Sequence, residues 1–216
     1  MLLHIVRHGQ TSWNAERRIQ GQLESELDET GIRQAQNRGV DFASMKLHAI
    51  YSSSSVRTRQ TTANILGSRD ELVTFRDDLR EVKLGIWQGQ LWEDIEKAYP
   101  EMVEAHWKAL PSFNVEGAEN FREVQGRGVA AIESIIKAHS NAKPTDNILV
   151  VSHGAIMKSI LCHYAAIALT DMHMLPPLPN CAHCIVESDG DKRTITQIAG
   201  EQFANTEWAK AAQSAS

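Results

Sequence analysis

Two short apolar runs in this chain each end in a histidine that is followed by glycine. Residues 2–6 lead into Arg7-His8-Gly9, and residues 148–152 lead into His153-Gly154. Apolar runs of this length that stop at glycine and polar residues are typical of buried parallel strands. Ligands bind at the carboxyl edge of open α/β sheets. We therefore expect Arg7, His8 and His153 to reach one pocket, where Gly9 lets the backbone come close to a ligand.

Strand and helix patterns alternate along the rest of the chain. Strands are expected over 47–51, 72–75, 182–187 and 193–198, with the last two joined as a hairpin. Helices are expected over 28–42, 56–66, 119–138 and 154–164. This alternation predicts an α/β fold, a three-layer sandwich in which a mostly parallel central sheet carries helices on both faces.

Apolar spacing also predicts which helix residues face the sheet. In the helix that Asp28 would cap, they are Ile32, Ala35, Gly39 and Phe42. In the helix that the serine run 52–55 would cap, they include Val56, Ala63 and Leu66.

Residues 84–113 do not follow this alternation and are expected to form a helical insertion. Its large side chains include Trp87, Trp92, Trp107 and Phe113. Between residues 85 and 117 the only cations are Lys97 and Lys108, and acidic residues outnumber them. We expect one domain over residues 1–216, with about residues 84–118 forming a cap over the pocket.

Composition limits the partners and the compartment. The net charge of −5 and a pI near 6.0 argue against a nucleic-acid-binding surface, so an anion site must be a local basic pocket. No run approaches the roughly 18 apolar residues of a membrane span, and residues 1–6 are too short for a signal peptide. Three cysteines in a chain of this length are expected to be reduced, in the cytoplasm. Cys181 and Cys184 form a C-x-x-C pair, predicted as structural thiols, with metal or redox work as the alternative.

The basic residues at the expected sheet edge fit a phosphate. Arg7 follows the first strand, and Arg57 lies just inside the helix after the second. One guanidinium group can donate two parallel N–H bonds to a phosphate, and it stays charged at any working pH. The amino end of that helix would add unpaired N–H groups. Asn14 and Gln20 could donate amide N–H groups to the same phosphate, while Arg57 alone could equally be a solvated helix charge.

A histidine in such a pocket can act as a nucleophile. A neutral imidazole nitrogen can attack phosphorus and hold the phosphoryl group covalently, and nearby cations keep that nitrogen unprotonated. Glu81 is the best-placed carboxyl to protonate the leaving oxygen, although its position alone also fits a surface ion pair. A metal site is the competing use of two histidines and a carboxylate, but two arginines would repel a divalent cation.

Four motifs resemble those of the histidine phosphatase superfamily, the phosphoglycerate mutase-like enzymes. They appear in the order 7–14 (RHGQTSWN), 51–61 (YSSSSVRTRQT), 79–81 (LRE) with Gly85, Trp87 and Gly89, and 151–154 (VSHG). Residues 19–21 and 27–31 are similar to the family's first loop and helix. Ser54-Ser55, Glu26 and Asn120 depart from frequent family residues, and the longer basic insertion of the mutases is absent between residues 89 and 119.

The resemblance implies a phosphohistidine on His8, with Glu81 as general acid and then base. It assigns the phosphate and substrate contacts to Arg7, Asn14, Gln20, Gly21, Arg57, Glu81, His153 and Gly154. It implies that the protein needs no metal or cofactor and acts on a small phosphorylated metabolite. Its oligomeric state is left open, with a homodimer as one option. We expect a metal-independent phosphomonoesterase. A phosphoglycerate mutase and a silent phosphate-binding domain are the alternatives.

Overall fold

Seven strands form one mixed sheet in the described part of the chain. The structure is a computed structural model that describes residues 1–108 and 115–214, without the side chains of residues 107, 108 and 214. The strand order is β3-β2-β4-β1-β5-β6-β7. Their bounds are β1 Leu2–Arg7, β2 Leu47–Ser53, β3 Val73–Arg76, β4 Asn147–Ser152, β5 His183–Asp189, β6 Lys192–Ile198 and β7 Glu201–Gln202.

The prediction of a mostly parallel sheet holds for only half of the strand pairings. The pairs β3–β2, β2–β4 and β4–β1 are parallel, whereas β1–β5, β5–β6 and β6–β7 are antiparallel. The hairpin expected over 182–198 is present as β5 and β6, and a short connection of this kind requires antiparallel strands. The strand β1 therefore lies where the parallel half of the sheet meets the antiparallel half.

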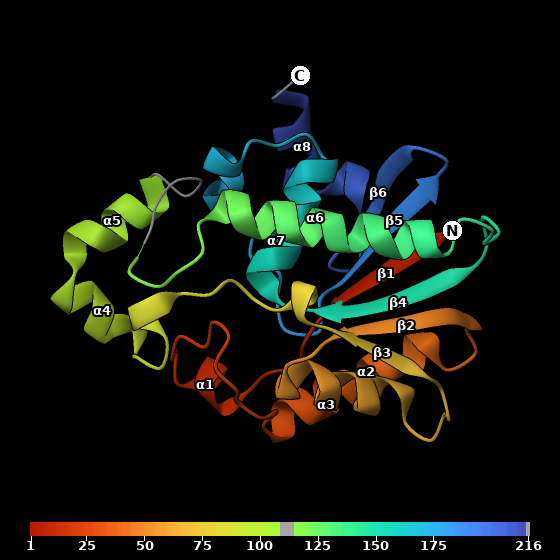
Figure 1. Ribbon diagram of the computed structural model, residues 1–216, viewed down its shortest axis with the longest axis horizontal. Helices are drawn as coiled ribbons and strands as arrows, with labels where there is room; N and C mark the ends of the chain where they lie inside the picture. Colours follow the sequence, from red (N-terminus) through yellow and green to blue (C-terminus); the bar gives the residue numbers. More distant parts are fainter. Residues whose placement is uncertain (109–114, 215–216) are drawn as a thin grey trace.

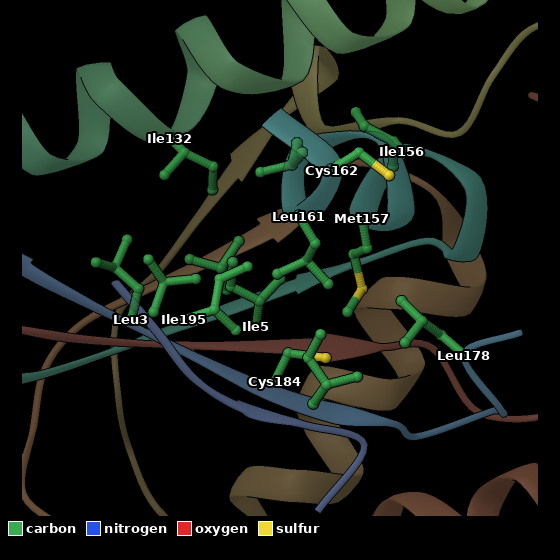
Figure 2. Packing of buried hydrophobic residues seen from close by; sticks show 14 of the residues in the cluster. Leu3, Ile5, Ile132, Ile156, Met157, Leu161, Cys162, Leu178, Cys184 and Ile195 are labelled. Carbon is green, nitrogen blue, oxygen red and sulfur yellow. The ribbon is translucent and has the colours of Figure 1, made fainter. Parts of the chain in front are cut away.

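Helices cover both faces of the sheet (Figure 1). Helices α2 (Glu29–Phe42) and α3 (Val56–Leu66) lie on one face, and α6 (Phe121–Ala138) and α7 (Gly154–Tyr164) lie on the other. Alternate residues of β1 enter two separate apolar clusters. Leu3 and Ile5 pack with α6 and α7, whereas Val6 packs with α2 and α3. Figure 2 shows Ile5 beside Leu161 of α7.

The remaining elements are short. They are α1 Ser12–Ala15, η1 Asp77–Leu79, η2 Gly85–Trp87, α4 Trp92–Ala98, α5 Pro100–Lys108, η3 Leu169–Met174, η4 Phe203–Asn205 and α8 Glu207–Ser214.

Two of the predicted helix faces are partly wrong. In α2 the buried residue of the first turn is Gly31, whereas Ile32 is 36% exposed. A Cβ on Gly9 would lie 2.5 Å from the carbonyl oxygen of Gly31. Gly9 is thus needed for contact with α2, not only for approach to a ligand, and this contact turns Ile32 outward. In α3 Ala63 is exposed, because this helix buries a largely polar face that includes Thr58, Thr61 and Thr62.

The insertion contains α4 and α5, which extend away from the sheet (Figure 1). It has a small apolar cluster of its own, formed by Trp87, Ile95, Val103 and Val115. Trp87 is fully buried, and Trp92 packs against it with ring centroids 6.1 Å apart. Phe113 lies outside the described residues, as do the side chains of residues 107 and 108.

The three cysteines, Cys162, Cys181 and Cys184, are buried and form no disulfide. Among the described helices, none has the length and apolar character needed to cross a membrane.

Candidate active site

The two histidines leave neighbouring parallel strands at the same edge of the sheet. Strand β1 pairs with β4 so that Arg7 lies opposite Ser152, and each strand is followed at once by a histidine. The rings of His8 and His153 have their centroids 5.3 Å apart, and both side chains are buried. The predicted meeting of the two strand–histidine motifs is therefore confirmed as geometry.

The backbone fixes which nitrogen of His8 carries a proton. Its Nδ1 lies 2.7 Å from the carbonyl oxygen of Gly9. Since a carbonyl can only accept, Nδ1 carries the hydrogen and Nε2 keeps its lone pair. Burial, followed by the charges of Arg57 and Arg7, holds the pKa of His8 well below its usual value. His8 is therefore a neutral imidazole with a free Nε2 lone pair at neutral pH.

Arg57 is almost completely buried, with 1% of its surface exposed, and its guanidinium group is fixed on three sides. Its two terminal nitrogens donate to the carbonyl oxygens of Gly21, at 2.7 Å, and Leu23, at 2.8 Å. Its Nε donates to Nδ1 of His153 at 3.2 Å. Burial lowers the pKa of Arg57 to about 10, which leaves it charged at neutral pH.

The contact with Arg57 also sets the tautomer of His153. Because Nδ1 accepts, Nε2 carries the hydrogen and donates to Oγ of Ser53 at 2.8 Å. Burial, with the charge of Arg57 second, holds the pKa of His153 well below its usual value. In this arrangement His153 supports Arg57.

Arg7 completes a pair of guanidinium groups around His8. One terminal nitrogen donates to the carbonyl oxygen of Leu178. Its Nε is buried and has no hydrogen-bond partner among the described residues. A Cβ on Gly154 would lie 3.1 Å from this Nε, so glycine gives the guanidinium the room to lie against the start of α7. A buried donor without an acceptor is costly and is usually satisfied by a ligand or water.

Glu81 lies at the amino end of α7. Its Oε2 accepts from the N–H of Ala155 at 3.0 Å, and its Oε1 accepts from those of Ile156 and Val82, also at 3.0 Å. The positive end of a helix dipole favours a carboxylate at this position. Glu81 also stabilises the charges of Arg7 and Arg57. Glu81 therefore belongs to the site and not to a surface ion pair.

One of the N–H groups predicted to be free at the amino end of α3 is already occupied. The N–H of Val56 donates to Oε2 of Glu24 at 2.8 Å. Ser55 occupies the N-cap position without a side-chain capping bond. The serines serve the site in another way, since Ser53 accepts from His153.

The first loop supplies two of the remaining predicted residues. Oδ1 of Asn14 accepts from the backbone and side chain of Thr11, at 3.2 Å each, and from Nδ2 of Asn180 at 3.3 Å. With Oδ1 occupied, the amide of Asn14 has its Nδ2 hydrogens left to offer. Gly21 holds Arg57 through its carbonyl. The side chain of Gln20 accepts a hydrogen bond from Ser25 and is described in none with either arginine.

Sequence reasoning missed three residues that hold the site together. Asn180 donates to the carbonyl oxygen of His8 at 3.1 Å. Thr61 accepts from the N–H of Gly9 at 3.0 Å. Ser53 belongs to the predicted helix-capping run and to the motif over 51–61, but neither predicts its contact with His153. Thr61 and Ser53 lie within the quoted motif over 51–61, which is a signal that could have found them. Asn180 has no such signal.

A cavity of about 330 Å³ opens beside these groups. Arg7, Glu81 and Gly154 line its inner end, and residues of the insertion line one wall. Among the described residues, no group of three or more His, Cys, Asp or Glu side chains is placed to hold a metal ion. His8, Arg57 and His153 are buried and do not line this cavity, although Arg7 was expected to share a pocket with both histidines. The arrangement offers a neutral nucleophile and a buried cation beside a cavity that Arg7 and the anchored carboxylate of Glu81 line.

Comparison with known proteins identifies the family. The model of the histidine phosphatase superfamily (branch 1) matches residues 3–200. The chain is 34% identical over 200 residues to phosphoglycerate mutase-like protein 4 of Arabidopsis thaliana, covering 91% of this chain and 84% of that protein. It is 30% identical over 196 residues to phosphoserine phosphatase 1 of Hydrogenobacter thermophilus, covering 91% and 90%. The structure of Bacillus stearothermophilus YhfR superposes with a TM-score of 0.85 at 30% identity, covering 93% and 96%. This chain therefore belongs to the histidine phosphatase superfamily.

Proposed function

We propose that this protein hydrolyses phosphomonoesters of small metabolites through a phosphohistidine on His8, without a metal or cofactor. The observation that carries the proposal is the hydrogen bond from Nδ1 of His8 to Gly9, which leaves Nε2 unprotonated between two arginines. In the first step Nε2 attacks phosphorus, the P–O ester bond breaks, and the leaving oxygen takes a proton. In the second step water attacks phosphorus, the P–N bond breaks, and inorganic phosphate leaves.

Arg7 and Arg57 stabilise the transition state of both steps. The equatorial oxygens of a transferring phosphoryl group gather negative charge, and fixed cations in a dry site favour this charge. The unpaired Nε of Arg7 offers a donor for one of these oxygens. Nδ2 of Asn14 and the N–H of Gly154, which Glu81 does not use, offer others.

Glu81 delivers the proton and later removes one from water. Its Oε1 already accepts two N–H groups, whereas Oε2 accepts one. An oxygen of a carboxylate has two lone pairs, so Oε2 is the atom that can hold the transferable proton. The glutamate acts as acid in the first step and as base in the second.

The first experiment tests the nucleophile. His8→Ala should abolish phosphate release, and wild-type enzyme stopped during turnover should contain a phosphoramidate that is labile to acid and stable to base. The control is His48→Ala, which removes an exposed histidine elsewhere on the sheet. Turnover at the wild-type rate by folded His8→Ala would refute the proposal.

A second experiment separates the roles of Glu81. An alkoxide leaving group needs a proton, whereas p-nitrophenolate does not. Glu81→Gln should therefore slow hydrolysis of alkyl phosphates much more than that of p-nitrophenyl phosphate. Equal losses on both substrates would mean that Glu81 acts by holding α7 or by placing water.

A phosphoglycerate mutase is the second candidate, because relatives are named as mutase-like or as probable phosphoglycerate mutase. A mutase must hold a small anion by its carboxylate while it reorients, which favours extra cations in the cap that residues 84–118 would form. Lys97, a cation of that segment, is exposed and lies 3.8 Å from Glu93. We therefore expect phosphate release with little conversion of 3- to 2-phosphoglycerate. Rapid interconversion that depends on a bisphosphate primer would favour the mutase.

A further inference from the structure

The cavity beside Glu81 has an aromatic wall, formed by Trp92, His106 and Phe121. The rings of His106 and Phe121 have centroids 6.0 Å apart, and Trp87 packs behind both Trp92 and His106. Burial lowers the pKa of His106 to about 4, so this ring is neutral at neutral pH. A flat apolar group fits against such a wall better than a polyhydroxylated one, which would need hydrogen-bond partners there.

A single lysine stands on another wall of the cavity. Lys158 of α7 is partly buried, and its Nζ donates to the carbonyl oxygen of Leu175 at 2.6 Å. An ammonium group has three N–H donors, so two are left. Within residues 1–108 and 115–214, no carboxylate forms an ion pair with Lys158. Burial lowers its pKa, and a smaller effect of the neighbouring Cys162 raises it.

The geometry of α7 sets the distance between Lys158 and the end of the cavity where Arg7 would bind the phosphate. Gly154, which touches Arg7, and Lys158 are four residues apart on α7. Positions i and i+4 share one face of a helix, at about 5–6 Å. A second anionic group on the substrate would meet Lys158 about one helical turn from the phosphoryl group.

We propose that the substrate is a phosphomonoester whose alcohol part has a flat, apolar body and carries a carboxylate, and that Lys158 selects for that carboxylate. The inference rests on the proposed phosphatase function and names the substrate class for the same site. Arg7 is committed to the phosphate, and Glu81 is held by Ala155 and Ile156. Lys158 is thus the charge left to recognise the leaving group. An alcohol that carries an ammonium group would be repelled by Lys158 and would find no free carboxylate among the described lining residues.

Three probes with nearly the same leaving-group chemistry test the proposal. They are 3-carboxybenzyl, benzyl and 3-(aminomethyl)benzyl phosphate, and kcat/KM is measured by phosphate release. The variant is Lys158→Met, which keeps the length of the side chain and removes its charge. The control is Lys192→Met, at an exposed position on β6. p-Nitrophenyl phosphate reports the basal chemistry of each protein.

Wild type and Lys192→Met should prefer the carboxybenzyl ester over the benzyl ester by about tenfold and should use the aminomethyl ester least. A charged hydrogen bond in a partly dry pocket is worth about this factor. Lys158→Met should lose the preference for the carboxylate, gain rate on the aminomethyl ester, and keep its rate on the benzyl ester.

Two results would overturn the inference alone. One is an equal loss on all three probes in Lys158→Met, and the other is no preference in wild type, each with p-nitrophenyl phosphate still hydrolysed. Loss of phosphate release from every ester in wild type would instead refute the proposed function itself.

Discussion

Protonation of His183 in the unfolded chain should make the stability of this protein fall steeply in mild acid. His183 is 6% exposed, and its Nε2 lies 2.9 Å from Nδ1 of His4. Nε2 of His4 in turn donates to Oδ1 of Asn147 at 2.9 Å, so His183 donates to His4 and both rings are neutral. Burial, with smaller contributions from His4 and Arg38, lowers the pKa of His183 to about 3. The protein therefore excludes a proton that the unfolded chain accepts.

The sign and size of this loss of stability follow from the difference between the pKa of His183 in the folded and in the unfolded state. The unfolded histidine has a pKa of about 6.5, above that of the folded state, so acid favours unfolding. The contribution of His183 to stability is fully present above about pH 6.5 and is lost as pH falls towards 3. Integrated from pH 7 to pH 5, the loss is about 2 kcal/mol of unfolding free energy.

Urea unfolding at pH 7 and pH 5 measures this loss. His183→Gln can still donate to His4 but cannot take up a proton, so its stability should fall by about 2 kcal/mol less than that of wild type over this range. Ile195→Val, on the neighbouring strand, is the control, because it lowers stability without removing a titrating group. Equal pH dependence in wild type and His183→Gln would refute the reasoning.

Three further results are expected. Dialysis against EDTA should leave phosphate release unchanged, and restoration of a lost activity by a divalent cation would contradict the proposed chemistry. Arg57→Lys cannot reach both Gly21 and Leu23 and should lower kcat/KM for p-nitrophenyl phosphate on the order of 10²-fold, whereas a loss below about threefold would count against this role. Asn120→Ala removes the capping box with Glu123 at the start of α6 and should cost about 1 kcal/mol in urea unfolding, with an unchanged midpoint as the contrary result.

The parts of the site that local sequence dictates were predictable. Each histidine follows its strand directly, so the apolar run and the glycine were enough to place His8 and His153 at one edge. Arg57 could be placed by its helix in the same way. The position of Glu81 needed more, because a 3₁₀ turn must meet the start of α7 before its carboxylate can accept from Ala155 and Ile156.

The errors came from contacts between segments far apart in the sequence. Ile32 fits the apolar spacing of α2, but the close approach of Gly9 and Gly31 decides how the helix is rotated. The N–H of Val56 at the amino end of α3 is occupied by Glu24, from a loop that sequence patterns leave undefined. Asn180 reaches His8 because of how the chain enters β5. None of these contacts follows from a periodic pattern in the sequence.

The separate apolar cluster of the insertion has a consequence for how the enzyme would fail on heating. Trp87, Ile95, Val103 and Val115 form a small cluster apart from those of the sheet. Units with few buried contacts open at a lower free energy than the whole molecule. His8, Arg57 and His153 are held by the sheet and by α3, so the loosened enzyme would keep its chemistry while its choice of leaving group broadened. On heating, the range of esters that the protein hydrolyses should therefore widen before its activity is lost.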